Sequence, residues 1–510
     1  MKIHFNRSAQ TASEVRMERG SRRHEGPAHL VQIVLERQSS APISRQLYLQ
    51  LRQAIVSGQI TAGARLPSTR AATRLWTISR GSVVEAYETL LNEGYLFGRG
   101  GSGTYVAKDV PERLVTAKHS QAERNAVLPR LSRAAQASAR SAALETPPQV
   151  PFVTGRSAPD AKTRSVLKRL AYRHVGILSD HYRDPQGEPH LRETVSSYLA
   201  AARGLRCSPE RIFITAGSQQ AIDLAIRTLT DPGDCVAIED PGYPPARLAL
   251  AAHGTRQLAV PVDEDGIRVE SLVGHGGNVQ AVYVTPSNQY PTGAVLSMAR
   301  RLALVDWAAA NGSWIIEDDY DSEFRYDERP LAALQGIDDH QTVVYIGTFS
   351  KALLPGLRLG YLVVPDRVVP AFRSMRTLLD RFPAPFQQLV VADFLREGHF
   401  SSHLRRLRET YRISRNRLVS ALRDRPEFEA DTPHQGVHLI ARLPEGIDDV
   451  AFAKAARRAG VTVGPVSPMC IGENPRQGLL LGFSALTDAE IEAGVARLVR
   501  ALDMEARDSP

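Results

Sequence analysis

The stretch YIGTFSKALLPGLRLGYLV, residues 345–363, decides the fold of the larger part of the chain. An apolar run typical of a buried strand is followed by Lys351, and two hydroxyl residues, Thr348 and Ser350, precede that lysine. Arg358 follows seven residues after this lysine. A lysine amine forms an imine with a carbonyl cofactor, while hydroxyls and a guanidinium hold a phosphate. A lone lysine after a strand is usually a surface charge, so this interpretation depends on the surrounding segments.

Three other segments carry the residue types that such a cofactor needs. WIIEDDYDSEF, residues 314–324, places Asp318 at a strand end with Tyr320 two residues on, and a carboxylate there keeps a pyridine nitrogen protonated. TAGSQQAIDLAI, residues 215–226, forms a strand-to-helix junction suited to a phosphate. EDPGYPPAR, residues 239–247, offers Tyr243 as an aromatic face for a pyridine ring. Each segment alone is common, but together at carboxyl ends of strands they predict a pyridoxal 5'-phosphate site.

After Phe152, short β-rich runs alternate with helical stretches such as QQAIDLAIRTL and SMARRLALVDWAAANG. This alternation predicts an α/β domain with a mostly parallel sheet covered on both faces.

The segment before it has a different pattern. SRQLYLQLRQAIVSGQI predicts an amphipathic helix with Ser44 as its N-cap, and Ser68 and Ser79 are expected to cap two further helices. Those two helices are separated by a short turn, as in a helix-turn-helix, and YLFGRGGSGTYVA then predicts a β-hairpin wing. The alternative is an amphipathic helix pair whose arginines are only solvated.

Charge is distributed unevenly over the 510 residues. The formal net charge is +8, and residues 1–150 hold 21 basic and 11 acidic side chains, so the excess positive charge lies in this third. This asymmetry points to a polyanion-binding module, with a basic solvated tail as the alternative, and charge alone does not distinguish the two. We expect a polar tail at 1–30, a DNA-binding domain at 31–109, a flexible linker at 110–150 and the α/β domain at 151–510.

The remaining composition excludes several classes of protein. With 43% hydrophobic and 23% charged residues the chain is expected to be globular rather than disordered. Its three cysteines are far apart, and His399 and His403 lack a Glu or Cys to complete a ligand set, so we expect no metal site. No apolar run approaches the ~20 residues of a membrane span, and no secretion signal opens the chain, which predicts a cytoplasmic protein without a membrane partner.

The N-terminal module closely resembles the winged helix of the GntR family of bacterial regulators. The LPS-x-R turn, the SR-x-x-V-x-x-AY helix and the GSGTYV wing occur in order over about 70 residues. One departure is Trp76-Thr77 in the turn, where the family usually has a small or Gly-containing segment. The expected contacts to double-stranded operator DNA are Arg65, Ser68, Arg70, Ser79, Arg80, Gly81, Ser82, Arg99, Gly101 and Gly103.

Residues from about 151 to 505 resemble class I aminotransferases, which have pyridoxal-phosphate fold type I with a smaller C-terminal α+β subdomain. A GntR winged helix joined to that fold is the architecture of the MocR-like regulators. The resemblance implies that Lys351 forms the internal aldimine with pyridoxal 5'-phosphate, and that fold type I sites are completed in a homodimer. The other implied cofactor-binding residues are Gly217, Ser218, Gln219, Tyr243, Asn288, Asp318, Tyr320, Thr348, Ser350 and Arg358.

Departures from the aminotransferase pattern bear on activity. Tyr290 stands where those enzymes have an Asn, and Asn288 stands where MocR-like proteins usually have a His. GLLLGFSAL, residues 478–486, lacks the arginine that grips a substrate carboxylate, and Arg476 lies just outside it. Pro245 replaces a second arginine used by GABA-responsive members, with Arg247 two residues further on. Without an arginine that holds the substrate carboxylate firmly, sustained turnover of an amino acid is disfavoured. We therefore expect a transcriptional regulator that senses the cofactor or an amine or amino-acid effector; the alternative is an active aminotransferase with an accessory DNA-binding domain.

Overall fold

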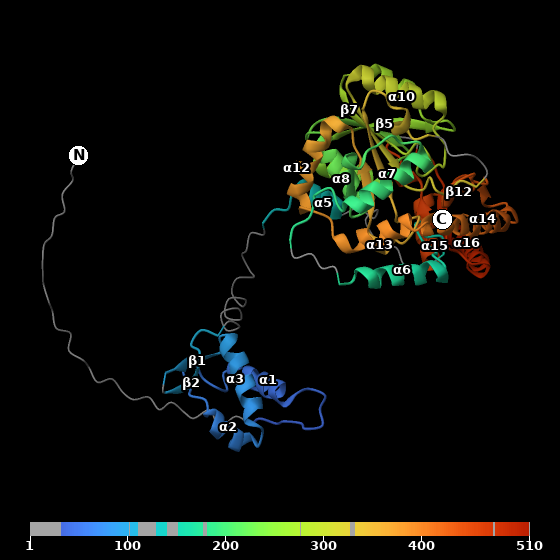
Figure 1. The fold of residues 1–510 in the computed structure, drawn as a ribbon. Coiled ribbons are helices and arrows are strands. Elements are labelled where there is room, and N and C mark those ends of the chain that lie inside the picture. The colour runs from blue at the N-terminus through green and yellow to red at the C-terminus, as the bar shows by residue number, and fades with distance from the viewer. Residues whose placement is uncertain are drawn as a thin grey trace, which may run out of the picture. The chain divides into compact units, whose positions relative to one another are not determined.

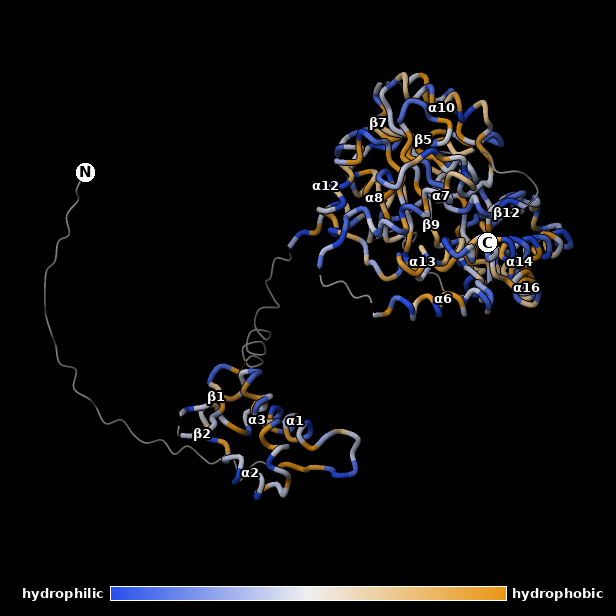
Figure 2. Tube along the Cα trace, in the orientation of Figure 1, coloured by the Kyte–Doolittle hydropathy of each residue, from blue (hydrophilic) through white to orange (hydrophobic). Residues whose placement is uncertain are grey.

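The chain divides into two compact units, Met1–Arg130 and Leu131–Pro510 (Figure 1). The computed structural model describes residues 32–100, 102–110, 129–139, 151–176, 181–275, 277–326, 332–472 and 475–508. Apolar segments run through the interior of the second unit, whereas outer helices such as α14 (His399–Arg423) carry hydrophilic stretches (Figure 2). Among the helices in these ranges, none has both the length and the apolar character needed to cross a bilayer.

The first unit is a winged helix with its own core. Its elements are α1 (Ile43–Val56), α2 (Thr69–Trp76), α3 (Arg80–Asn92), β1 (Leu96–Arg99) and β2 (Gly103–Val106). The apolar faces of α1 and α3 pack together through Leu47, Leu51 and Leu90, which are buried. The two strands pair antiparallel, from Leu96 opposite Val106 to Arg99 opposite Gly103. The predicted helix-turn-helix and wing are confirmed.

Serine caps define both helices of the helix-turn-helix. The Ser68 hydroxyl accepts a hydrogen bond from the Ala71 N–H at 3.3 Å, and the Ser79 hydroxyl accepts one from the Ser82 N–H at 3.1 Å. The prediction of Ser44 as the cap of α1 was wrong. That helix begins at Ile43 after Pro42, whose ring fixes a φ of −55°, and Ser44 is only 7% exposed.

The unusual dipeptide Trp76-Thr77 fits the turn without disturbing it. Trp76 packs against the core of the first unit. Thr77 adopts the left-handed conformation, with φ 53° and ψ 47°, and its N–H donates to the Thr73 carbonyl. This left-handed conformation, which glycine usually adopts at the end of a helix, ends α2. It is sterically less favourable for Thr77 than for a glycine.

The second unit is built on a mixed sheet of eight strands in the order β3-β10-β9-β8-β7-β4-β5-β6. From β9 to β5 the neighbours are parallel, while β10 is antiparallel to both β9 and β3, and β6 is antiparallel to β5. All six residues of β9 are buried, as expected for a strand covered on both faces. The strands are β3 (Ile212–Thr215), β4 (Cys235–Asp240), β5 (Arg256–Asp263), β6 (Gly266–Ile267), β7 (Val279–Val284), β8 (Trp314–Asp319), β9 (Val343–Thr348) and β10 (Gly360–Val363).

Helices cover this sheet from both sides, which confirms the predicted fold class. One apolar cluster joins the sheet to α8 (Ser218–Leu229), α9 (Pro244–His253) and α12 (Val369–Asp380). Other clusters join it to α7 (Pro189–Arg203) and α13 (Pro385–Arg396), and to α10 (Met298–Asn311). The remaining helices of this part are α6 (Ala161–His174), which packs on α13, and the short α11 (Leu334–Ile337).

A smaller C-terminal subdomain packs around a separate apolar cluster. It contains an antiparallel sheet in the order β11-β12-β14-β13, together with α14 (His399–Arg423) and two further helices. The other elements are β11 (Glu429–Ala430), β12 (His438–Arg442), α15 (Asp449–Arg458), β13 (Gly464–Pro465), β14 (Leu479–Gly482) and α16 (Asp488–Asp508).

Part of the segment expected to be a linker forms a helix, α5 (Arg133–Ala139). This helix belongs to the second unit and packs against α9. Residues 1–30 of the expected tail, and Gly101 of the expected DNA contacts, lie outside the described residues.

Candidate functional site

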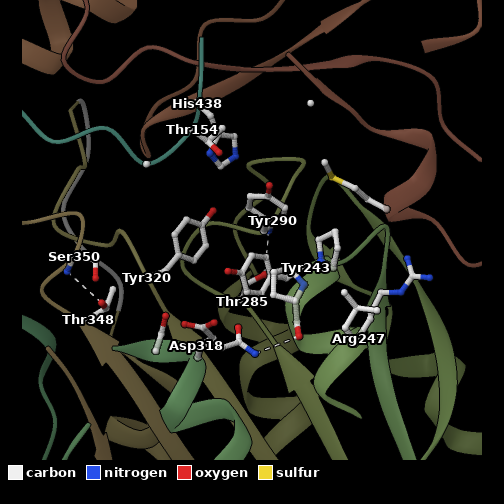
Figure 3. Close-up of a pocket in the computed structure, with 18 of the residues that line it drawn as sticks. Thr154, Tyr243, Arg247, Thr285, Tyr290, Asp318, Tyr320, Thr348, Ser350 and His438 are labelled. Atoms are coloured by element: carbon white, nitrogen blue, oxygen red, sulfur yellow. Dashed lines mark hydrogen bonds between the residues drawn. The ribbon is translucent and has the colours of Figure 1, made fainter. Parts of the chain in front are cut away.

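A cavity of about 820 Å³ lies at the carboxyl ends of the parallel strands, where open α/β sheets bind ligands. Its wall is formed by Ser218 and Gln219 at the start of α8, by residues after β4, β8 and β9, and by residues of the C-terminal subdomain. In Figure 3, Asp318 lies on the floor and His438 with Thr154 on the opposite side, which we call the roof. The predicted residues on the wall are Ser218, Gln219, Tyr243, Asp318, Tyr320, Thr348, Ser350, Lys351 and Arg358.

Asp318 faces the cavity because adjacent residues of a strand point to opposite sides. Its Oδ2 accepts a hydrogen bond from the Tyr283 hydroxyl at 2.5 Å, and its buried Oδ1 has no partner among the described residues. Asp319 points the other way and accepts a hydrogen bond from Arg203 Nε at 2.8 Å. Burial raises the pKa of Asp318 to about 6, and the nearby charge of Asp319 adds to the increase. The free Oδ1 is therefore an available acceptor on the floor.

Lys351 lies directly after β9 in the same cavity. Burial lowers the pKa of its amine, and the carboxylates of Asp321 and Asp318 oppose that decrease. Gly155 comes very close to it: a Cβ at this glycine, which has φ +88°, would lie 2.5 Å from Lys351 Nζ. A backbone segment without a side chain therefore leaves room for the amine.

One end of the cavity is lined by groups that bind anions. Ser218 and Gln219 begin α8, whose first N–H groups receive no side-chain cap. Arg358 donates from Nη2 to the Ala216 carbonyl at 2.8 Å. Gly217 does not line the cavity but lets this arginine approach, because a Cβ there would lie 3.3 Å from the guanidinium carbon. A helix N-terminus, hydroxyls and a guanidinium together match the requirements of a phosphate.

Aromatic rings form the wall above Asp318 (Figure 3). Tyr243 and Tyr320 each make an edge contact with Tyr290, at centroid distances of 5.2 and 6.1 Å. Asn288 lies behind this wall instead of on it. Its Nδ2 donates to the Tyr320 hydroxyl at 3.1 Å and to Asp321 Oδ2 at 2.7 Å. Asn288 therefore positions Tyr320 from outside the cavity.

Within the described part of the first unit, the expected DNA contacts lie just before or on α2, at the start of α3 and in the wing. Arg80 is the first residue of α3, and Gly81 beside it is also exposed. Arg99 lies over the rings of Phe97 and Tyr105. The hydroxyls of Ser79 and Ser82 bond to each other at 2.8 Å, so both also serve the N-terminus of α3. Five arginines in and around these elements are exposed, and none of them forms an ion pair with another residue of the described segments. They are Arg65, Arg70, Arg74, Arg80 and Arg99.

Both parts of the chain match known families. Residues 43–106 match the model of bacterial regulatory proteins of the gntR family, and residues 159–498 match that of aminotransferase class I and II. The chain is 35% identical over 475 residues to the probable rhizopine catabolism regulatory protein MocR of Rhizobium meliloti, covering 91% of this chain and 95% of that protein. This chain belongs to the MocR-type transcriptional regulators of the GntR family. It is also 32% identical over 454 residues to the pyridoxine biosynthesis transcriptional regulator PdxR of Corynebacterium glutamicum, covering 89% and 94% of the two chains.

The second unit of this MocR-type regulator has the aminotransferase fold. Its structure is similar to that of the alpha-aminoadipate aminotransferase LysN from Thermus thermophilus, with a TM-score of 0.64 and 29% identity. The match covers 70% of this chain and 93% of that one. That crystal structure is a complex with N-(5'-phosphopyridoxyl)-L-leucine.

In this MocR-type regulator, neither β14 nor position 245, where the resemblance places carboxylate-binding arginines, holds an arginine. Strand β14 reads Leu-Leu-Leu-Gly and is wholly buried. Arg476 donates to the Val262 carbonyl at 2.7 Å and lines a separate cavity of about 550 Å³. Arg247 does line the main cavity, but its Nη1 donates to the carbonyls of Pro468 and Cys470 at 3.2 and 3.3 Å. In Figure 3 it lies on the far side of Tyr243 from Tyr320.

Sequence reasoning missed several residues of this site. The Tyr283 hydroxyl donates a hydrogen bond to Asp318 from near the carboxyl end of β7, and His438 reaches the roof from β12 of the C-terminal subdomain. Gly155 lies nearly 200 positions before the lysine that it contacts. His403, weighed as a metal ligand, is buried and bonds instead to the Thr163 hydroxyl at 3.0 Å and the Ala352 carbonyl at 2.8 Å.

Proposed function

We propose that this regulator binds pyridoxal 5'-phosphate at Lys351 and that occupancy of the cavity changes its binding to operator DNA. The observation that carries the proposal is the free, buried Oδ1 of Asp318, which lies in one cavity with Lys351 and the anion-binding end around Arg358. When bound, the cofactor supplies an electrophilic carbon and an electron-accepting ring.

The residues of the cavity then have distinct tasks. The amine of Lys351 would attach the cofactor covalently, and Asp318 Oδ1 would accept a hydrogen bond from its protonated ring nitrogen. Ser218, Gln219, Thr348, Ser350 and Arg358 hold the phosphate, with Gly217 leaving space for that arginine. Tyr243 stacks on the ring and Tyr320, held by Asn288, lies beside the ring hydroxyl.

Adding pyridoxal 5'-phosphate to the purified, dialysed protein tests the cofactor step. A visible absorbance band distinct from that of the free compound, with saturable binding, is expected. A spectrum equal to the sum of protein and free compound would refute cofactor binding.

Cofactor affinity should depend on pH through Asp318. The pKa of this carboxyl is raised to about 6, so it is charged above that pH and neutral below it. Because only the carboxylate pairs with a protonated ring nitrogen, affinity should fall as pH drops through about 6. Equilibrium titrations on both sides of this pH measure the effect. Asp318→Asn should bind weakly and lose this step; an unchanged step in that variant would assign the pH dependence to another group.

The proposal extends to the state in which the protein acts. We propose a cytoplasmic homodimer whose two winged helices contact paired half-sites in the operator, with Arg80 of each reaching a base edge. The arginines around each helix-turn-helix would bind phosphates. An amine or amino acid entering the cavity, or the cofactor itself, would be the effector.

Transamination is the second candidate function, because Lys351, Asp318 and Arg358 share one cavity. The uncharged strand β14 argues against sustained turnover of amino acids. Half-reactions followed by a multiple-turnover assay with a common keto acid separate the two: rapid turnover would favour the enzyme.

A further inference from the structure

Helix α5, which follows the wing in the chain, cannot be stable by itself. It has seven residues and begins after Ser132, whose hydroxyl accepts a hydrogen bond from the Ala135 N–H at 3.1 Å. Its first turn starts with Arg133 and contains no acidic residue, which is the reverse of what the helix dipole favours. Isolated helices of this length are marginal in water. The helical form of α5 therefore depends on its packing against α9.

The face of α5 that packs against α9 is small. Among the residues of α5 whose exposure is described, Ala134 and Ser138 are half-buried, whereas Ala135 is exposed. Residues four positions apart lie on the same side of a helix, so Ala134 and Ser138 mark the docked face. A contact of this size can break while the rest of the second unit stays folded. Helix formation and docking of α5 are thus one two-state step.

Helix α9, on which α5 docks, is also a wall of the main cavity. Its N-cap is Tyr243, the residue that we propose stacks on the cofactor ring. One side of the helix is anchored in the apolar core by Ala246 and Leu250. The other cavity-lining residues of α9 are Pro244, Pro245, Arg247, Leu248 and Ala251. A single helix therefore contacts both the space for the cofactor and the docked part of the linker.

We propose that α5 is a switch in the linker, docked on α9 when the cofactor fills the cavity and released when the cavity is empty. This inference rests on the proposed function, because it names the element through which occupancy acts. A ring stacked on Tyr243 orders the first turn of α9, so that docking of α5 then costs less conformational entropy. By reciprocity, docked α5 raises the affinity for the cofactor by the same factor. Release moves the point where the linker joins the second unit from α5 towards Pro151, which changes the reach of the winged helix.

Hydrogen exchange in the full-length protein, with and without saturating pyridoxal 5'-phosphate, measures the switch directly. The amides of α5 should exchange at least about fivefold more slowly when the cofactor is bound. The visible absorbance of the same samples reports cofactor binding separately. A cofactor band with unchanged exchange in α5 would overturn the switch and leave the proposed cofactor site standing, whereas the absence of a band would refute both.

Ala134→Glu and Ala135→Glu form a matched pair of variants. Both add the same charge to the same helix, but only Ala134 lies on the docked face. In Ala134→Glu, α5 should exchange rapidly with or without cofactor, the cofactor should bind about fivefold more weakly, and operator affinity should no longer respond to it. Ala135→Glu should match the wild type in all three measurements. Equal behaviour of the two variants would overturn the inference.

Discussion

Replacing Lys351 with alanine should abolish the covalent attachment of pyridoxal 5'-phosphate and the visible absorbance that accompanies it. No other amine lines the described cavity, and the Lys351 amine is favoured as the nucleophile because burial lowers its pKa. After borohydride reduction of the wild-type protein, mass spectrometry should locate the cofactor on the peptide that contains Lys351. Peptides of the alanine variant should carry none.

Matched controls separate loss of the amine from loss of fold or charge. Lys351→Arg keeps a cation at the same position but cannot form the linkage, so it should behave like the alanine variant. Lys454→Ala removes an exposed lysine on α15 and should bind cofactor as the wild type does. Covalent cofactor in Lys351→Ala, or its loss in Lys454→Ala, would contradict the assignment.

Replacing Arg80 with alanine should weaken operator binding by about 5- to 150-fold, the equivalent of about 1–3 kcal/mol for one bidentate contact to a base. The side chain is exposed at the first position of α3, where recognition helices reach base edges. It forms no ion pair within the described segments, so its removal disturbs no internal partner. Binding to operator and to unrelated DNA, measured at several salt concentrations, should show that specificity is lost as well as affinity.

Two other arginines provide the comparison. Arg74→Ala should weaken binding to all sequences alike and reduce the salt dependence by about one counterion, as expected of a phosphate contact. Arg405→Ala removes an exposed arginine from α14 in the second unit and should leave operator binding unchanged. If Arg80→Ala and Arg405→Ala have the same effect, α3 is not the recognition helix.

The floor of the cavity could be predicted from sequence because it depends on local patterns. Strand ends place Asp318 and Lys351 at one edge of a parallel sheet, and the alternation of side chains separates Asp318 from Asp319. The serine caps of α2 and α3 are equally local. Ser44 failed as a cap because the proline two residues earlier starts the helix and packing buries the serine.

The roof could not be predicted in this way. His438 belongs to a strand of the C-terminal subdomain, and its approach to Tyr320, more than 100 positions earlier, depends on how the two parts pack. Gly155 likewise meets Lys351 only through the tertiary fold. The contact of α5, which lies within the segment 110–150 expected to be a linker, with α9 likewise depends on the surface that α9 presents once folded.

Operator affinity, measured with and without pyridoxal 5'-phosphate in wild type and in Lys351→Ala, tests the central claim most directly. If occupancy of the cavity is coupled to DNA binding, the cofactor should change the wild-type dissociation constant by about fivefold or more, in line with coupling energies between sites. Lys351→Ala should bind operator without responding to the cofactor. Identical wild-type affinities with and without the cofactor, or an equal response in the variant, would contradict a regulator that senses ligands through Lys351.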